Sequence, residues 1–429
     1  AAKAAAAAEA EGVVDRLCVM AAQGSSIVTC KRDGSGVRKL LPRTELQELT
    51  RSGQLQQPTW SPDGQKIAFT AMRIGEGKIA EARLVIYNER HQREVYNAAF
   101  KHPPFYMQWS PDSKTLTFLA QGADGNVQMV SVDTTREAAA GGARLVDKGT
   151  PLFFATAAAA EGEPLRYLVH NGSKRTVTRV DPRTGASELV CLTSGSMFMA
   201  PAAHRRGGRE SVLVVEGGHL TSMTADGRGR GGGGAEEGGG DPPKKRLVHV
   251  KGFSTFLLSP DEQKVALMQQ DLITGAYSVK LVRADGDALD PTSDAAVSQE
   301  DLPVGNILLA YFWSPDSTKL LCLSTNFGRN ELALARNALK QGYNLKCRWK
   351  VVDVDTGKVT NYPEFTPRTF YIKVYLPFFD QYAQSYTPWS PDSQSFGYVS
   401  QEGAFVQRIG EEGPLRIAKQ AEFSTWSWC

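Results

Sequence analysis

The chain has 429 residues, a formal net charge of +3 and a hydrophobic content of 41%. A charge so close to neutral argues against a partner that is a nucleic acid or another polyanion, and the apolar runs are too short to form a transmembrane segment. The length exceeds one ordinary compact domain, which favours several domains or a repeat architecture. None of the six cysteines forms a Cys-x-x-Cys pair. We therefore predict no structural zinc and no cofactor, with buried reduced thiols that favour an intracellular reducing compartment.

The first twelve residues, AAKAAAAAEAEG, are Ala-rich and lack an initiator Met. We expect residues 1–12 to be a tail and residues 13–429 to form the folded domain. Such a start resembles the remnant of a processed N-terminus. A chloroplast protein whose transit peptide has been removed is one interpretation of this segment.

One phrase recurs five times, with Ser-Pro-Asp at its centre. It reads WSPDGQKIAF from Trp60, and similar text begins at Trp109, Leu258, Trp313 and Trp389. Pro presets φ in a tight turn, Asp accepts hydrogen bonds from turn amides, and the alternating apolar residues that follow indicate a strand. The phrase therefore predicts a strand–turn–strand hairpin. The text between copies supplies two more strands, which gives the four antiparallel strands of a propeller blade.

Two degenerate copies fill gaps between the clear ones. Phe154 stands at the Trp position in the first, and Met199 stands there in the second, with Pro201 holding the turn. With the C-terminal copy described next, the Trp positions number eight and predict a single eight-bladed, all-β propeller. Seven blades are the alternative if either degenerate copy is spurious.

The ends of the chain complement each other. The C-terminus carries a first strand, residues 423–429, with no hairpin partner after it. The N-terminal text from residue 13 reads as the second, third and fourth strands of a blade that has no first strand. We therefore predict that Phe423, Trp426 and Trp428 close the ring, with Trp428 at the Trp position, since closure removes open sheet edges.

The repeated aspartates could be mistaken for a catalytic carboxylate cluster. Each follows Ser-Pro in a turn, where its carboxylate accepts local amide hydrogen bonds. We interpret them as structural: Asp63, Asp112, Asp261, Asp316 and Asp392. No His has another His within four residues, and no catalytic or metal-binding residue is predicted. The Gly-rich stretch at 227–240 is interpreted as a solvated insertion rather than a nucleic-acid-binding segment.

One connection is longer and more aromatic than a blade requires. It contains LPFFDQYAQSY, and a second insertion at 327–348 precedes it. Aromatic groups with a few polar neighbours are typical of binding surfaces at a channel mouth. The hypothesis is a partner-binding surface, with core packing as the alternative. Its residues are Phe378, Phe379, Asp380, Gln381 and Tyr382.

The repeated WSPDG phrase resembles the blades of TolB-type propellers and of the propeller domain in the prolyl oligopeptidase and dipeptidyl peptidase family. The resemblance covers about residues 13–429. No G-x-S-x-G nucleophile motif occurs, so the resemblance extends to the propeller and not to the peptidase. It implies a non-catalytic interaction or scaffold protein, a subunit of a multiprotein complex. The alternatives are a hydrolase or lyase with a site at the channel mouth, or the partner propeller of a separate peptidase.

Overall fold

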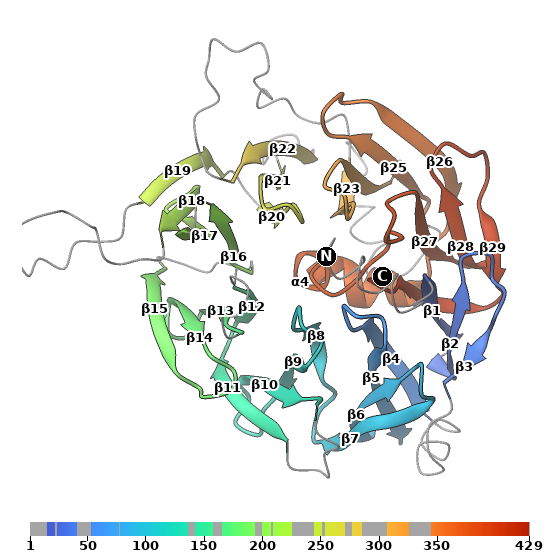
Figure 1. Cartoon of the computed structure of the whole chain (residues 1–429), viewed down its shortest axis with the longest axis horizontal. Helices are drawn as coiled ribbons and strands as arrows, with labels where there is room; N and C mark the ends of the chain where they lie inside the picture. The colour runs from blue at the N-terminus through green and yellow to red at the C-terminus, as the bar shows by residue number, and fades with distance from the viewer. Residues whose placement is uncertain are drawn as a thin grey trace, which may run out of the picture.

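The computed structural model describes most of the chain, and Figure 1 shows its arrangement. The described residues are 15–21, 24–40, 53–76, 78–135, 142–157, 165–193, 200–206, 209–224, 244–250, 254–270, 277–284, 307–325 and 345–428. The expected tail, the Gly-rich insertion, Met199 and most of the insertion at 327–348 lie outside these ranges. The last two residues of that insertion, Cys347 and Arg348, belong to a strand.

Eight antiparallel sheets stand around a central axis, each with one strand close to the axis and the others further out (Figure 1). The prediction of an all-β, eight-bladed propeller is confirmed. Blades are numbered here from the one that contains the N-terminal strands.

The strands of the first four blades run outward from the axis in the order given. Blade 1 contains β30 (Ala421–Trp426), β1 (Arg16–Ala21), β2 (Ile27–Lys31) and β3 (Arg38–Lys39). Blade 2 contains β4 (Gly53–Trp60), β5 (Lys66–Gly75), β6 (Lys78–Asn88) and β7 (Arg93–Phe100). Blade 3 contains β8 (Phe105–Trp109), β9 (Thr115–Gln121), β10 (Val127–Asp133) and β11 (Ala143–Gly149). Blade 4 contains β12 (Leu152–Thr156), β13 (Tyr167–Asn171), β14 (Thr176–Val180) and β15 (Ser187–Leu192).

The remaining blades follow the same order. Blade 5 contains β16 (Ala202–Arg206), β17 (Arg209–Glu216), β18 (His219–Thr224) and β19 (Lys244–His249). Blade 6 contains three described strands, β20 (Ser254–Leu258), β21 (Lys264–Gln270) and β22 (Tyr277–Arg283). Blade 7 contains β23 (Ile307–Trp313), β24 (Lys319–Thr325), β25 (Cys347–Asp353) and β26 (Val359–Phe365). Blade 8 contains β27 (Ser395–Ser400), β28 (Gly403–Arg408) and β29 (Leu415–Ala418), and a bridge from Trp389 to Phe396 takes the place of its first strand.

The Ser-Pro-Asp turns share one hydrogen-bond pattern. In blade 7, the Asp316 carboxylate accepts hydrogen bonds from the Ser314 hydroxyl at 2.5 Å and the Thr318 amide at 3.1 Å. The Asp316 backbone amide in turn donates to the Ser393 hydroxyl of blade 8, at 3.1 Å. The same contact joins Asp63 to blade 3 and Asp261 to blade 7. Each carboxylate therefore supports a turn, and the turns of Asp63, Asp261 and Asp316 are also hydrogen-bonded to the next blade.

The repeated tryptophans also join neighbouring blades. The Trp109 indole N–H donates to the Thr59 carbonyl of blade 2, at 3.3 Å. Trp313 and Trp389 make the equivalent bond to the blade before them, at 3.0 and 3.2 Å. A buried indole is stabilised when its N–H finds an acceptor. Within the described residues the buried indole nitrogens of Trp60 and Trp426 have no such acceptor, so this bond is made by three of the repeats and not by all.

The C-terminal strand closes the ring. β30 pairs antiparallel with β1, and Trp426 lies opposite Leu17. At the seam, the Arg32 guanidinium is 5.4 Å from the centre of the Trp426 ring, and its Nη1 atom is 2.8 Å from the Asp392 carboxylate of blade 8. Arg32 also forms an ion pair with Asp15. β30 therefore closes the ring by completing the sheet of blade 1, and the Arg32 cation joins blade 1 to blade 8.

The register of this strand differs from the prediction by two residues. Trp426, not Trp428, occupies the Trp position, because Trp426 pairs with Leu17 as Trp60 pairs with Ile67. The Ser427 amide donates to the Arg16 carbonyl, as the Ser61 amide donates to Lys66. Trp428 lies beyond the strand.

The degenerate copies are shifted as well. In blade 4 the Trp position is Thr156, which pairs with Tyr167, and Phe154 lies two residues earlier on the same face. In blade 5 the first strand begins after Pro201, so Pro201 precedes the strand and does not hold its turn. Both errors leave the number of blades unchanged.

We expect Asp316→Ala to lower the free energy of unfolding by about 0.5–2 kcal/mol, because it removes the acceptor that supports the turn. Urea denaturation monitored by fluorescence would measure the change. Asp355→Ala is the control, since Asp355 is exposed and makes one ion pair, with Lys264. Equal stability of the Asp316 variant and the wild type would show that the carboxylate does not support the fold.

Candidate binding site at the ring axis

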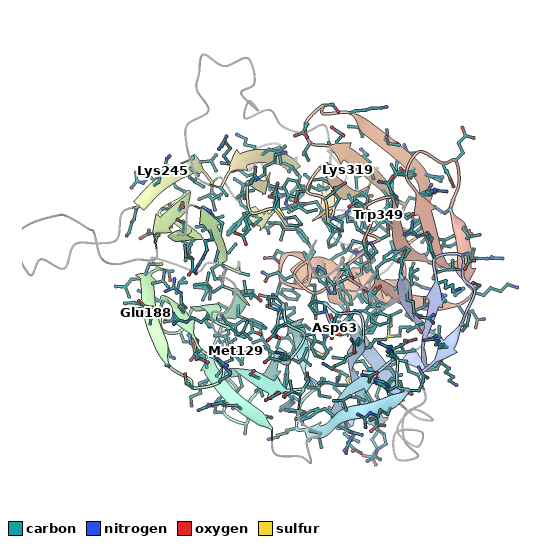
Figure 2. All side chains as sticks on the ribbon, in the orientation of Figure 1. Asp63, Met129, Glu188, Lys245, Lys319 and Trp349 are labelled. Carbon is teal, nitrogen blue, oxygen red and sulfur yellow. The ribbon has the colours of Figure 1, made fainter. Side chains whose placement is uncertain are left out.

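The two faces of the ring differ in what they carry. Because strands alternate in direction, the Ser-Pro-Asp turns all lie on one face, called here the turn face. The connections from one blade to the next lie on the opposite face, called the connector face. Figure 2 shows that the Ser-Pro-Asp turn of blade 2, marked by Asp63, lies near the centre of the ring. Glu188 and Lys245, which belong to outer strands, lie at its rim.

Part of the connection between blades 7 and 8 enters the ring. It forms η3 (Tyr371–Tyr375), η4 (Leu376–Phe378) and α4 (Phe379–Tyr382), and α4 occupies the centre of the ring in Figure 1. Residues 371–386 are called the plug below. Pro377 at the start of η4 fits a helical first turn, because its missing N–H would have no partner there.

The plug is attached to the first strands of five blades. Its ring contacts are Tyr375 with Phe423, Tyr382 with Tyr106 and Phe379 with Tyr311, at centroid distances of 4.4, 4.5 and 5.3 Å. Its hydrogen bonds run from Gln57 Nε2 to the Tyr382 hydroxyl at 2.8 Å and from Gln381 Nε2 to the Phe154 carbonyl at 3.1 Å. Contacts in so many directions fix the plug as part of the core.

The five residues expected to form a partner surface are divided by the structure. Phe379, Asp380, Gln381 and Tyr382 are buried, with exposed fractions of 3–8%, whereas Phe378 is 49% exposed. Burial removes the first four from contact with a partner in this conformation, so the expected surface is reduced to Phe378. The Phe378 ring lies 6.0 Å from that of Tyr106, near the start of β8, which places it toward the connector face.

Asp380 is the unusual ionisable group of the plug. Burial raises the pKa of its carboxyl to about 6, although the amides of Gln381 and Asp380 itself partly oppose the shift. Its Oδ2 atom is buried and has no hydrogen-bond partner within the part of the chain that the structure describes. The neutral acid is therefore the form that this position favours.

We expect Asp380→Asn to stabilise the protein at neutral pH. Because its pKa is raised, the stability that Asp380 contributes is fully present below about pH 4 and is lost as the pH rises through about 6. The free energy of unfolding lost in this way is at most roughly 3 kcal/mol. Asn imitates the neutral acid at every pH. The difference in unfolding free energy between variant and wild type, measured by denaturation from pH 4 to 7.5, should therefore grow with pH. A constant difference would contradict the assignment.

A cavity of about 390 Å³ lies on the turn-face side of the plug and is called here the vestibule. Its floor contains Ala383, Gln384 and Tyr386 of the plug, and its wall contains the strand ends and turn prolines of blades 6, 7 and 8. No charged side chain lines it among the described residues. The volume falls within the range of small-molecule sites.

The vestibule exists because two blades have lost the repeat. Blades 4 and 5 contribute the small residues Ala155, Thr156, Ala202 and Ala203 to the wall, whereas blades 6 and 7 contribute bulky ones such as Leu258 and Trp313. Sequence reasoning treated these copies as degraded and missed their consequence. The alanine-rich text ATAAAAEG and APAAHRR was the available signal, because small residues at a packed position leave a hollow.

Metal and imidazole chemistry have little support in the described part of the chain. There, no three His, Cys, Asp or Glu side chains are grouped so that they could hold a metal ion. His170 is fully buried, and burial lowers the pKa of its imidazole to about 4. None of the helices within the described ranges reaches the length and hydropathy needed to cross a bilayer.

Comparison with known proteins supports the fold alone. No family model matches the sequence, and no curated protein matches it. Among solved structures, the dihydro-heme d1 dehydrogenase NirN in complex with DHE aligns with a TM-score of 0.52 and 9% identity, over 96% of this chain and 75% of that chain. TolB from Acinetobacter baumannii aligns with a TM-score of 0.34 and 15% identity, over 63% of this chain and 62% of that chain. Prolyl oligopeptidase B from Galerina marginata aligns with a TM-score of 0.49 and 10% identity, over 80% of this chain and 46% of that chain.

The resemblance to TolB-like propellers that the repeats indicate is therefore a likeness of fold. The match spans less than two thirds of the TolB chain and less than half of the peptidase chain. The identities are too low to carry any activity from those proteins to this one.

Proposed function

We propose that this protein is a non-catalytic interaction propeller that binds a protein partner on its connector face as a subunit of a larger assembly. The observation that carries the proposal is the plug. In a propeller, the side chains of several blades converge on the axis, where they are placed to act on a substrate. In this protein that place is filled by the aromatic residues of the plug.

The competing interpretation is a hydrolase or lyase with its site at the channel mouth. In such a site we would expect acids and bases on a solvent-accessible wall. Asp380 lies in the plug at the ring axis, and the pKa of its carboxyl is raised toward neutrality. Its exposed fraction is 8%, so it does not lie on an accessible wall. It is absent from the wall of the vestibule, where no described residue is charged. Both features support binding over catalysis.

Phe378 is the residue that we assign to the partner contact. Large aromatic side chains dominate interface energies, and truncation of a central one costs over ~2 kcal/mol of binding, about thirtyfold in affinity. Its neighbours in the plug hold the backbone in place, so that little conformational freedom is lost when a partner binds.

We expect Phe378→Ala to lose the partner while the protein keeps its stability, because this side chain is half exposed. Affinity purification from the native source, with proteins quantified against the wild-type bait, would test this. Leu415→Ala is the matched control, since Leu415 is 51% exposed on β29 at the rim of blade 8. Identical co-purifying proteins for both variants and the wild type would overturn the assignment.

A further inference from the structure

The vestibule opens on the face opposite Phe378 and has its own chemistry. It is apolar over most of its surface, it is bordered by rigid prolines such as Pro315 and Pro391, and no charge lines it among the described residues. An ion that enters such a cavity loses its hydration without gaining a countercharge. An uncharged ligand does not meet this cost.

Two polar features stand in the wall. Gln108 Nε2 donates to Gln384 Oε1 at 3.2 Å, and this bond joins the wall of blade 3 to the plug. Gln108 Oε1 is buried and has no hydrogen-bond partner among the described residues. This acceptor is closed to solvent, so a ligand N–H reaches it when the Gln108 side chain turns toward the cavity, and the acceptor then gains the partner that it lacks.

Trp428 is the second feature. It lies two residues past the Trp position of blade 1, so the repeat does not require an aromatic residue there. Its side chain is partly buried against the core and lines the vestibule. Within the described residues its indole N–H makes no hydrogen bond, which leaves a ring face and a donor at the cavity.

We propose that the vestibule binds an uncharged small molecule that has an aromatic ring system and an amide group. The ring packs against Trp428 and the apolar wall formed by residues such as Leu257 and Phe312. The amide N–H donates to Gln108 Oε1, and the amide carbonyl accepts from the Gln384 side chain or the Trp428 indole. Ring stacking of this kind prefers offset or edge contacts.

Three probes of equal shape test the charge requirement: 2-naphthamide, 2-naphthoate and 2-naphthamidinium. Binding to the full chain would be measured by ligand-observed NMR and by quenching of tryptophan fluorescence. We expect saturable binding of the neutral amide, at least tenfold tighter than that of either ion. Binding of an ion as tight as that of the amide, or no saturable binding of the amide up to its solubility limit, overturns the proposal.

A cavity-filling variant tests the location. Thr156→Trp restores the residue that the repeat places at this position in blades 2 and 3. Thr156 pairs with Tyr167 as Trp60 pairs with Ile67 and Trp109 with Leu116. We expect it to reduce amide affinity at least tenfold. Thr156→Val is the matched control, because it preserves volume and should retain binding.

Ala202→Leu fills the same cavity from blade 5 and decides the question if Thr156→Trp does not fold. Unchanged amide affinity in a folded filling variant overturns the location. Loss of affinity in a filling variant with retention in Thr156→Val supports it. The proposal does not depend on the partner surface, because Phe378→Ala leaves the vestibule intact.

Discussion

Deletion of residues 423–429 should convert the protein into an aggregating chain. The deletion removes most of β30, so that β1 loses its inner partner and exposes an open edge. It also removes Phe423 and Trp426, which are 2% and 0% exposed. Loss of one buried Trp or Phe costs roughly 3–5 kcal/mol, and typical domains are stable by about 5–15 kcal/mol. Size-exclusion chromatography and thermal melting would measure the outcome.

A shorter deletion separates closure from the mere loss of terminal residues. Removal of 428–429 leaves β30 and its pairing with β1 intact, so we expect a monomer whose melting temperature is close to that of the wild type. A monomeric 423–429 deletion with an unchanged melting temperature would refute the closure of the ring by this strand.

Phe379→Ala should cause a large loss of stability. The Phe379 ring lies 5.3 Å from that of Tyr311 and 6.4 Å from that of Phe312, and its exposed fraction is 4%. Truncation of a buried Phe typically costs 3–5 kcal/mol, through lost burial and the cavity left behind. Urea denaturation should show a clearly lower midpoint.

The neighbouring residue provides the comparison. Phe378→Ala removes the same number of atoms from a half-exposed position and should change the free energy of unfolding by less than about 1 kcal/mol. If both variants lost equal stability, the burial difference between these two adjacent rings would be wrong. If neither lost stability, the plug would not be part of the core.

The fold could be predicted because its signal is local and repeated. Five copies of one turn phrase determine a hairpin, and a hairpin repeated at blade spacing leaves few alternatives to a ring. The register within a strand was harder. In STWSW, a strand that included both Trp426 and Trp428 would place them on the same face at period two, so alternation alone cannot distinguish a shift of two residues. The Ser427 amide, bonded to Arg16, identifies the correct Trp.

The candidate sites were less accessible from the sequence. Aromatic density in LPFFDQY indicated that the segment is unusual, but whether Phe379 or Phe378 is buried depends on how much room the ring leaves at its axis. That room is a property of all eight blades together. The vestibule is harder still, because Thr156 and Ala203 contribute to it by being small, and a missing side chain leaves no motif.

The pairing of β30 with β1 also means that the two partners are synthesised at very different times. Arg16 and Ser427, which are hydrogen-bonded at the closed seam, are separated by 411 residues. At about 5–20 residues per second, a ribosome makes the second partner roughly 20–80 s after the first. During that interval β1 has no inner neighbour, and its edge is available to other nascent chains. Strand β1 is therefore exposed to aggregation for longer than a strand whose partners both follow it closely in the sequence.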